Sequence, residues 1–208
     1  MNYSNKIGCY QGDCDVLLGK YPKFSDYVKE FSRTQLGKGL DLGCGPGACN
    51  GKFFQSCTLD GCDADKSVVD SAPEDYQDCF AFKLGKDSLP YNDENKDFVI
   101  LSCVIQHLNS YDELVTGLAD VARILKPTGQ LFLMFKAGAN DTQLTHYNEV
   151  YNEIREFRVF HPDNIQELAK KNLKLRVISC ENLLDDNWIP YSCMVLEKQS
   201  LHGQSVSL

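Results

Sequence analysis

The sequence predicts an α/β fold: a doubly wound, mostly parallel sheet of seven strands, with helices on both faces and an antiparallel strand at one edge. Two observations carry this prediction. Strand patterns and helix patterns alternate from Gly39 onward, which is typical of a parallel sheet. The last two strand patterns follow each other without a long helix between them, so we expect an antiparallel edge strand there.

The individual elements follow from hydrophobic periodicity and from turn residues. We expect strands at Gly39–Leu42, Cys57–Cys62, Cys79–Lys83, Asp97–Cys103, Gln130–Phe135, Leu173–Ser179 and Tyr191–Glu197. We expect helices at Phe24–Ser32, Gly47–Phe54, Lys66–Ser71, Tyr111–Leu125, Thr145–Phe157 and Asp163–Lys171. The helix from Tyr111 is the clearest, because Leu114, Leu118 and Val121 recur at spacings of three and four residues.

A chain of 208 residues fits one domain with a sizeable core. We predict a single domain over residues 1–198, in which residues 1–36 form an N-terminal lid segment and helix, residues 37–137 form the ligand-binding core, and residues 138–162 are an insertion on the acceptor side. Residues 199–208 are polar and without periodicity, so we expect a flexible tail.

Charge and composition narrow the function. The net charge is −8 and the isoelectric point is near 5.0, which disfavours nucleic acid as a partner and favours a small-molecule acceptor. No apolar run approaches the roughly 18 residues of a membrane span, so we expect a cytoplasmic protein that does not enter a membrane. The 10 cysteines form no C-x-x-C pair, so we expect reduced thiols and no metal site. Nothing in the sequence defines an oligomeric state.

The chain is organised around the stretch from Leu40 to Gly47, a short apolar strand that ends in a glycine turn. Glycines there allow a ligand to lie against the backbone. The turn also fits the dinucleotide fingerprint, because Asp63 follows Gly43 by about 20 residues. Asp41 distinguishes a dinucleotide from a cationic ligand. A carboxylate inside a strand costs free energy unless it has a partner, and the ammonium group of a ligand would be such a partner.

The stretch Leu40-Asp41-Leu42-Gly43-Cys44-Gly45-Pro46-Gly47 resembles the first motif of the class I S-adenosylmethionine-dependent methyltransferases. Three further stretches match that family in order, namely Leu59–Asp65, Ser88–Tyr91 with Asp97–Ser102, and Leu125–Gln130. The resemblance covers residues 36–137 closely. It implies that S-adenosylmethionine is the cofactor and that S-adenosylhomocysteine is the product.

The resemblance also implies roles for individual residues. Asp63 would bind the ribose hydroxyls, with helix capping as the alternative, and Asp41 would hold the methionine ammonium. The backbone of Gly43, Cys44 and Gly45 would lie along the methionine and ribose, Ala64 beneath the adenine, and Ser102 and Cys103 beside the methionine. The family often has an acid at the position of Gly85, whereas this chain has Asp87 two residues later. Adenine contacts are therefore expected from Lys86, Asp87 and Ser88.

The acceptor side is expected after the fourth strand and in the insertion, because ligands bind at the carboxyl ends of such strands. Gln106 and His107 would face the acceptor, with His107 as a candidate general base or as a residue that only fixes the loop. Tyr147, Tyr151 and His161 would line the pocket, as the family's segment after the fifth strand does. The alternative for this segment is a packed surface helix.

We therefore predict an S-adenosylmethionine-dependent methyltransferase that acts on a small molecule by in-line methyl transfer. Three other functions remain open from the sequence. The first is a protein or tRNA methyltransferase that works with a partner subunit. The second is a nicotinamide dehydrogenase, against which Asp41 counts. The third is a cofactor-binding protein without turnover, because methyl transfer requires no particular catalytic side chain.

Overall fold

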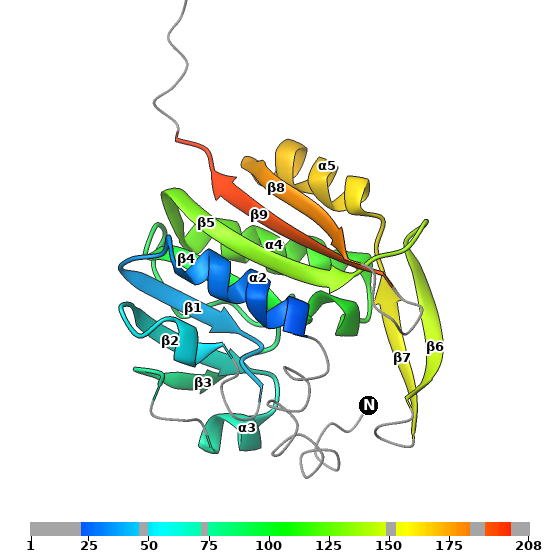
Figure 1. Ribbon diagram of the computed structural model, residues 1–208, viewed down its shortest axis with the longest axis horizontal. Coiled ribbons are helices and arrows are strands. Elements are labelled where there is room, and N and C mark those ends of the chain that lie inside the picture. The colour runs from blue at the N-terminus through cyan, green and yellow to red at the C-terminus, as the bar shows by residue number, and fades with distance from the viewer. Residues whose placement is uncertain (1–21, 46–49, 72–74, 149–152, 184–189, 201–208) are drawn as a thin grey trace, which may run out of the picture.

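The computed structural model describes residues 22–45, 50–71, 75–148, 153–183 and 190–200. All seven predicted strands are present in one sheet of order β3-β2-β1-β4-β5-β9-β8 (Figure 1). They are β1 (Lys38–Leu42), β2 (Thr58–Asp63), β3 (Cys79–Ala81), β4 (Lys96–Ser102), β5 (Leu125–Lys136), β8 (Leu175–Leu183) and β9 (Tyr191–Lys198). The strands from β3 to β5 are parallel, and β9 runs antiparallel to both β5 and the edge strand β8. The predicted fold class is confirmed.

Helices cover both faces of the sheet. They are α2 (Pro22–Ser32), α3 (Lys66–Asp70), α4 (Tyr111–Ile124) and α5 (Pro162–Asn172), with short 3-10 turns η3 (Gly51–Phe53) and η4 (Ile105–His107). Figure 1 shows α2 in front of the sheet and α4 behind it. Val28 and Phe31 of α2 are buried on one face, and Leu118 of α4 and Ile165 of α5 are buried on the other. These two apolar clusters hold the sheet between them.

Helix α4 forms as its sequence predicts. Its apolar stripe is buried, with Leu114, Leu118 and Val121 each at most 1% exposed. Ser110 caps the helix, because its side chain accepts a hydrogen bond of 3.1 Å from the backbone N–H of Glu113. The helix therefore has a defined first turn, and that turn lies at the end of the sheet where β4 also ends.

The predicted helix at Thr145–Phe157 is wrong, because this segment forms the hairpin of β6 (Thr142–Asn148) and β7 (Glu153–Val159). Burial in β7 follows a period of two, since Phe157 and Val159 are buried and Glu156 is exposed. The apolar residues of this segment are spaced as in an amphipathic helix. However, β7 packs against η4, and this tertiary contact favours strands. Of the predicted helix at Gly47–Phe54, residues 47–49 lie outside the described residues, and the remainder contains η3.

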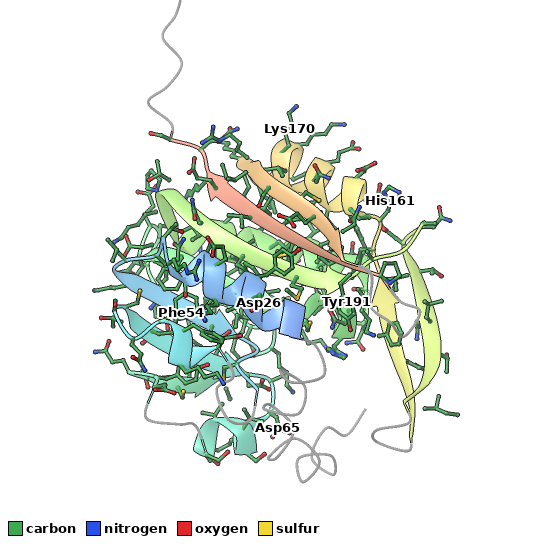
Figure 2. All side chains as sticks on the ribbon, in the orientation of Figure 1. Asp26, Phe54, Asp65, His161, Lys170 and Tyr191 are labelled. Carbon is green, nitrogen blue, oxygen red and sulfur yellow. The ribbon has the colours of Figure 1, made fainter. Side chains whose placement is uncertain are left out.

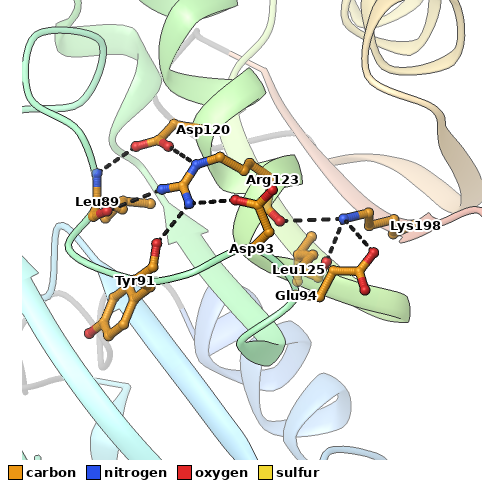
Figure 3. Close-up of polar contacts among 8 residues, drawn as sticks. All are labelled: Leu89, Tyr91, Asp93, Glu94, Asp120, Arg123, Leu125 and Lys198. Carbon is orange, nitrogen blue, oxygen red and sulfur yellow. Dashed lines mark hydrogen bonds and ion pairs between the residues drawn. The ribbon is translucent and has the colours of Figure 1, made fainter.

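The loop between β3 and β4 is tied to α4 and β9 by a polar network (Figure 3). The guanidinium of Arg123 donates to the carbonyl oxygens of Leu89 (3.1 Å) and Tyr91 (2.7 Å) and forms an ion pair with Asp93 (3.0 Å). Lys198 of β9 in turn donates to the carbonyl oxygen of Leu125 (2.7 Å). This network fixes the loop that carries the predicted adenine contacts.

Within the described residues, no helix is both long and apolar enough to cross a membrane. Each cysteine in the described ranges has a free thiol; these are Cys44, Cys57, Cys62, Cys79, Cys103, Cys180 and Cys193. The lid segment proposed for the N-terminus and the flexible tail lie outside the described residues, apart from the helix α2 and the first two residues of the tail.

Candidate functional site

The candidate site lies where β1 and β4 end side by side. The chain leaves β1 toward β2 and β3, whereas β4 continues toward β5, so the sheet order reverses between these two strands. Such a reversal opens a crevice at the carboxyl ends of the strands. Gly43, at a φ of +79°, lies against Val104, and a Cβ added there would be 2.3 Å from Val104 Cγ2. Only glycine allows this approach, which brings the two strand ends together.

Asp41 is fully buried beneath the glycine turn and has two protein partners. The Tyr76 hydroxyl donates to Oδ2 at 2.6 Å, and the Asn50 amide donates to Oδ1 at 3.2 Å. Burial raises the pKa of this carboxyl group to about 6, although both hydrogen bonds oppose the shift. The sequence analysis identified the acid but missed both partners. No local pattern could have found Tyr76, which is 35 residues away in the chain.

Asp63 ends β2 and faces the glycine turn. Its Oδ2 accepts a hydrogen bond from the Gly45 N–H at 3.1 Å, and its Oδ1 accepts one from the Asp65 N–H at 3.0 Å. An ionised carboxylate offers about four acceptor positions, so Asp63 retains capacity for further hydroxyl donors. Asp65, rather than Asp63, caps α3 by accepting from the Ser67 N–H at 2.9 Å. The neighbouring Ala64 is exposed.

The turn itself is held by backbone hydrogen bonds. The N–H groups of Gly43 and Cys44 both donate to the carbonyl oxygen of Cys62, at 2.7 and 3.0 Å. Gly45 has a φ of +65°, and a Cβ placed on it would meet nothing within 4 Å among the described residues. This glycine therefore has an open side. The Cys44 side chain is buried in the core on the α2 face, and burial raises the pKa of its thiol far above the usual value, so it stays protonated.

The predicted adenine loop packs on the first turn of α4. A Cβ on Gly85 would lie 2.2 Å from the carbonyl oxygen of Glu113, so this position has no space for a side chain. The Asp87 carboxylate accepts from the Lys83 N–H at 2.8 Å, and the Lys86 ammonium lies 3.5 Å from a Glu113 carboxylate oxygen. Ser88 is exposed in the same loop. The side chains of Lys86 and Asp87 thus interact with other residues of the protein.

The chain turns sharply after β4. Cys103 has a φ of +60°, which is uncommon for a residue with a side chain, and its N–H donates to the Met134 carbonyl oxygen at 2.8 Å. Ser102 is half-buried at the end of the strand, and His107 is exposed at the end of η4. Gln106 is only 3% exposed, and its Oε1 has no hydrogen-bond partner among the described residues. The structure therefore brings the predicted methionine and acceptor residues to one turn.

Of the three other residues predicted to line the acceptor pocket, the structure describes two. Tyr147 lies in β6, paired with Ile154 of β7, whereas Tyr151 lies outside the described residues. His161 caps α5, because its Nδ1 accepts from the Asp163 N–H at 3.2 Å. In Figure 2, His161 lies at the start of α5, far from Asp65 at the start of α3. Capping explains His161 without any substrate.

Sequence reasoning missed Lys136 at the end of β5. Its ammonium lies 4.3 Å from the ring centroid of Phe157 and 5.1 Å from that of Tyr191, which Figure 2 labels at the start of β9. Such cation–π contacts hold a lysine in place. A charged residue directly after a buried apolar strand was the available signal, since parallel strands carry functional residues at their carboxyl ends.

Comparison with known proteins agrees with this architecture. Residues 40–133 match the family described as "Methyltransferase domain". A probable tRNA methyltransferase 9B from Bos taurus is 30% identical over 128 residues, which cover 57% of this chain and 28% of that protein. A tRNA (carboxymethyluridine(34)-5-O)-methyltransferase from Arabidopsis thaliana is 27% identical over 131 residues, or 61% of this chain and 30% of that protein. The chain thus spans less than a third of the length of these relatives.

These relatives correct one prediction. The acidic composition disfavoured nucleic acid and favoured a small-molecule acceptor, but the curated relatives are named as tRNA methyltransferases. The inference failed because net charge averages over the whole surface, whereas binding of a polyanion depends on the local distribution of charge.

Solved structures share the fold. A methyltransferase from Methanosarcina mazei has a TM-score of 0.65 at 16% identity and covers 78% of this chain and 92% of its own. The 1,6-didemethyltoxoflavin-N1-methyltransferase of Burkholderia thailandensis, solved with S-adenosylhomocysteine, has a TM-score of 0.68 at 15% identity and covers 95% of this chain and 87% of its own. The four ordered motifs, the sheet order and the match over residues 40–133 together support a class I S-adenosylmethionine-dependent methyltransferase.

Proposed function

We propose that this protein transfers a methyl group from S-adenosylmethionine to an oxygen atom on a modified uridine of tRNA. The observation that carries the proposal is that two separately named tRNA methyltransferases align with more than half of this chain. The Arabidopsis relative is named for methylation of an oxygen on a carboxymethyluridine. The alignment supports this substrate class.

The residues around the glycine turn fit the cofactor. Gly45 leaves an open side, Asp63 retains acceptor positions for ribose hydroxyls, and Asp41 is a buried acid below the turn. A cation next to Asp41 would stabilise its ionised form, which burial disfavours. We therefore assign the ribose to Asp63 and the ammonium group to Asp41, directly or through a bound water. The bound cofactor supplies an electrophilic methyl group.

The protein's own contribution is mainly orientation. Holding two reacting groups in line lowers a barrier by on the order of 7 to 11 kcal/mol. A carboxylate oxygen is already ionised at neutral pH and needs no general base, whereas a hydroxyl needs one. His107, exposed at the end of η4, is the candidate base in the second case. Cys103 is a poor nucleophile, because burial raises the pKa of its thiol.

Transfer of a labelled methyl group tests the proposal. The purified chain is incubated at low salt with labelled S-adenosylmethionine and, separately, with unfractionated tRNA and with a protein-free metabolite extract. Label in a nucleoside released by nuclease digestion of the tRNA, absent with Asp63→Ala, is the expected result. Label only in the metabolite fraction, or in neither, would overturn the proposed acceptor.

A further inference from the structure

Lys136 places a positive charge at the end of β5, beside the end of β4. The two strands are parallel neighbours, in which Ser102 of β4 pairs with Met134 of β5, two residues before Lys136. The Cys103 N–H, in the turn after β4, donates to the Met134 carbonyl oxygen at 2.8 Å. Lys136 is half-buried, so part of it is accessible at this edge of the sheet. It extends from the same strand ends as the residues predicted to face the methionine.

Two aromatic rings hold the Lys136 ammonium group in place. Its nitrogen lies 4.3 Å from the ring centroid of Phe157 in β7 and 5.1 Å from that of Tyr191 in β9. Both residues are buried, at 5% and 8% exposed, so the rings are themselves fixed by packing. A ring face attracts a cation through its quadrupole but carries no net charge. These two contacts therefore orient the ammonium group and do not cancel its charge.

The proposed reaction brings an acceptor group to the same place. The acceptor atom must lie in line with the methyl carbon and the sulfur, and Ser102 and Cys103 are predicted to face the methionine beside Lys136. A carboxylate suits this position, because it is ionised at neutral pH and has two oxygens. One oxygen can accept from the ammonium group while the other faces the methyl carbon. A hydrogen bond between such charged groups is roughly twice as strong as a neutral one.

We propose that the Lys136 ammonium group donates to one carboxylate oxygen of the acceptor base, so that Lys136 selects a uridine with an acidic substituent over one with a neutral substituent. This inference rests on the proposed function, because it takes a modified uridine of tRNA as the acceptor. The second oxygen forms the bond to the methyl carbon as the bond from that carbon to sulfur breaks. The electron pair of the broken bond stays on sulfur, no proton moves, and the product is a neutral methyl ester.

Matched RNAs test this selection without turnover. The full chain is saturated with S-adenosylhomocysteine and titrated into two dye-labelled RNA hairpins, followed by fluorescence anisotropy. The hairpins differ in a single loop base, which is 5-carboxymethyluridine in the first and its neutral amide, 5-carbamoylmethyluridine, in the second. Both carry the same phosphates, so the ratio of their affinities reports the carboxylate. The first is expected to bind about tenfold more tightly. Equal binding, or no binding of either hairpin, would overturn the inference.

Variants assign the preference to Lys136. Lys136→Met keeps an unbranched aliphatic stem between the rings but removes the charge, and Lys136→Gln is a second neutral variant. Each is expected to bind the two hairpins equally and to keep the wild-type affinity for S-adenosylhomocysteine. Lys136→Arg keeps a cation and is expected to retain part of the preference. The matched control is Lys126→Met at the opposite end of β5, where the Lys126 ammonium pairs with the Asp97 carboxylate at 2.7 Å; it should leave the preference unchanged.

The outcomes separate this inference from the proposed function. Methylated tRNA together with equal binding of the two hairpins would leave the function standing and remove the role of Lys136. Unmethylated tRNA together with a preference that depends on Lys136 would remove the tRNA acceptor and keep the carboxylate site. A preference that survives in both neutral variants would assign the carboxylate to another group. Loss of S-adenosylhomocysteine affinity in those variants would show that Lys136 binds the methionine carboxylate of the cofactor. Either of the last two results overturns the inference.

Discussion

At the residue scale, the site depends on two carboxylates with different environments. Asp41 is fully buried and bonded to the neutral donors Tyr76 and Asn50, whereas Asp63 is partly exposed and bonded to backbone N–H groups. Among the described residues, neither carboxylate accepts a hydrogen bond from a protein cation. Both are therefore suited to receive donors from a ligand, and each gives a measurable prediction.

Removal of Asp63 is expected to weaken the cofactor site. Asp63→Ala removes an ionised acceptor for two hydroxyl donors, so the affinity for S-adenosylhomocysteine should fall by about a hundredfold, given about 1.5 to 3 kcal/mol for a hydrogen bond to a charged group. Isothermal titration calorimetry measures this affinity. The matched control is Asp65→Ala, which removes the cap of α3 and costs about 1 kcal/mol of stability but keeps the affinity. An unchanged affinity in Asp63→Ala would remove the ribose assignment.

Asp41 gives a prediction about pH. Its pKa is raised from 3.8 to about 6, so the folded protein holds this proton more tightly than the unfolded chain does. The stabilisation from the protonated Asp41 is fully present below the pKa that this group has in the unfolded chain. It is lost as the pH rises through the folded pKa of about 6, and the loss in free energy of unfolding is on the order of 3 kcal/mol. Asp41→Asn has no carboxyl group to titrate at this position. The free energy of unfolding of the variant, relative to that of wild type, should therefore increase between pH 4 and pH 7.

Denaturant unfolding at several pH values checks the sign. The exposed Asp26→Asn serves as the control and should leave the difference from wild type constant over this range. Affinity of the wild type for S-adenosylhomocysteine should rise over the same pH interval, because only ionised Asp41 attracts an ammonium group. A relative stability of Asp41→Asn that falls with pH would contradict the assignment.

At the element scale, the loop between β3 and β4 is shaped by its contact with α4. The Arg123 guanidinium donates to the carbonyl oxygens of Leu89 and Tyr91 (Figure 3). Gly85 lies against the backbone of Glu113. These contacts leave no space for a side chain at Gly85. We therefore predict that adenine contacts come from other groups of the loop, such as its backbone.

Substitutions at Gly85 and Gly45 distinguish the cost of a steric clash from the cost of an unfavourable backbone conformation. Gly85→Ala puts a Cβ 2.2 Å from a backbone oxygen at a φ of +78°, so we expect a loss of at least about 3 kcal/mol of stability. Gly45→Ala has a φ of +65° but open space, so its cost should be close to 1 kcal/mol. Thermal unfolding measures both. Equal losses in the two variants would show that the loop moves away from α4 at little cost.

At the scale of the whole molecule, an acidic protein is proposed to bind a polyanion. The net charge of −8 opposes association with tRNA at long range, whatever the local contacts are. Arg158 of β7 is a cation beside η4, because its guanidinium donates to the Asn109 carbonyl oxygen. We therefore predict that RNA binding would depend on a few local contacts, with Arg158 as one candidate.

Salt distinguishes RNA binding from cofactor binding. The KM for tRNA should rise steeply between 50 and 200 mM salt, with a logarithmic slope of about −0.7 to −0.9 in affinity for each phosphate contact. The affinity for S-adenosylhomocysteine should change little, because that ligand carries no phosphate. Arg158→Gln is expected to reduce the slope by about one contact. A KM for tRNA that is independent of salt would exclude phosphate recognition by this chain.

The sequence by itself determined the sheet, its strands and the positions of Asp41, Gly43, Gly45 and Asp63, because these depend on local hydrophobic periodicity and on the backbone demands of a tight turn. Sequence periodicity alone misassigned the β6–β7 hairpin, since apolar residues at helical spacing also fit a strand that is buried on one face.

The contacts between distant segments became visible in the three-dimensional structure. It joined Tyr76 to Asp41, placed Gly85 against Glu113 and left the Gln106 oxygen buried without a partner among the described residues. These features arise from packing between elements, and a pattern within one segment carries no information about what faces it. The geometry of the glycine turn was therefore local and predictable, whereas the contacts between distant segments were not.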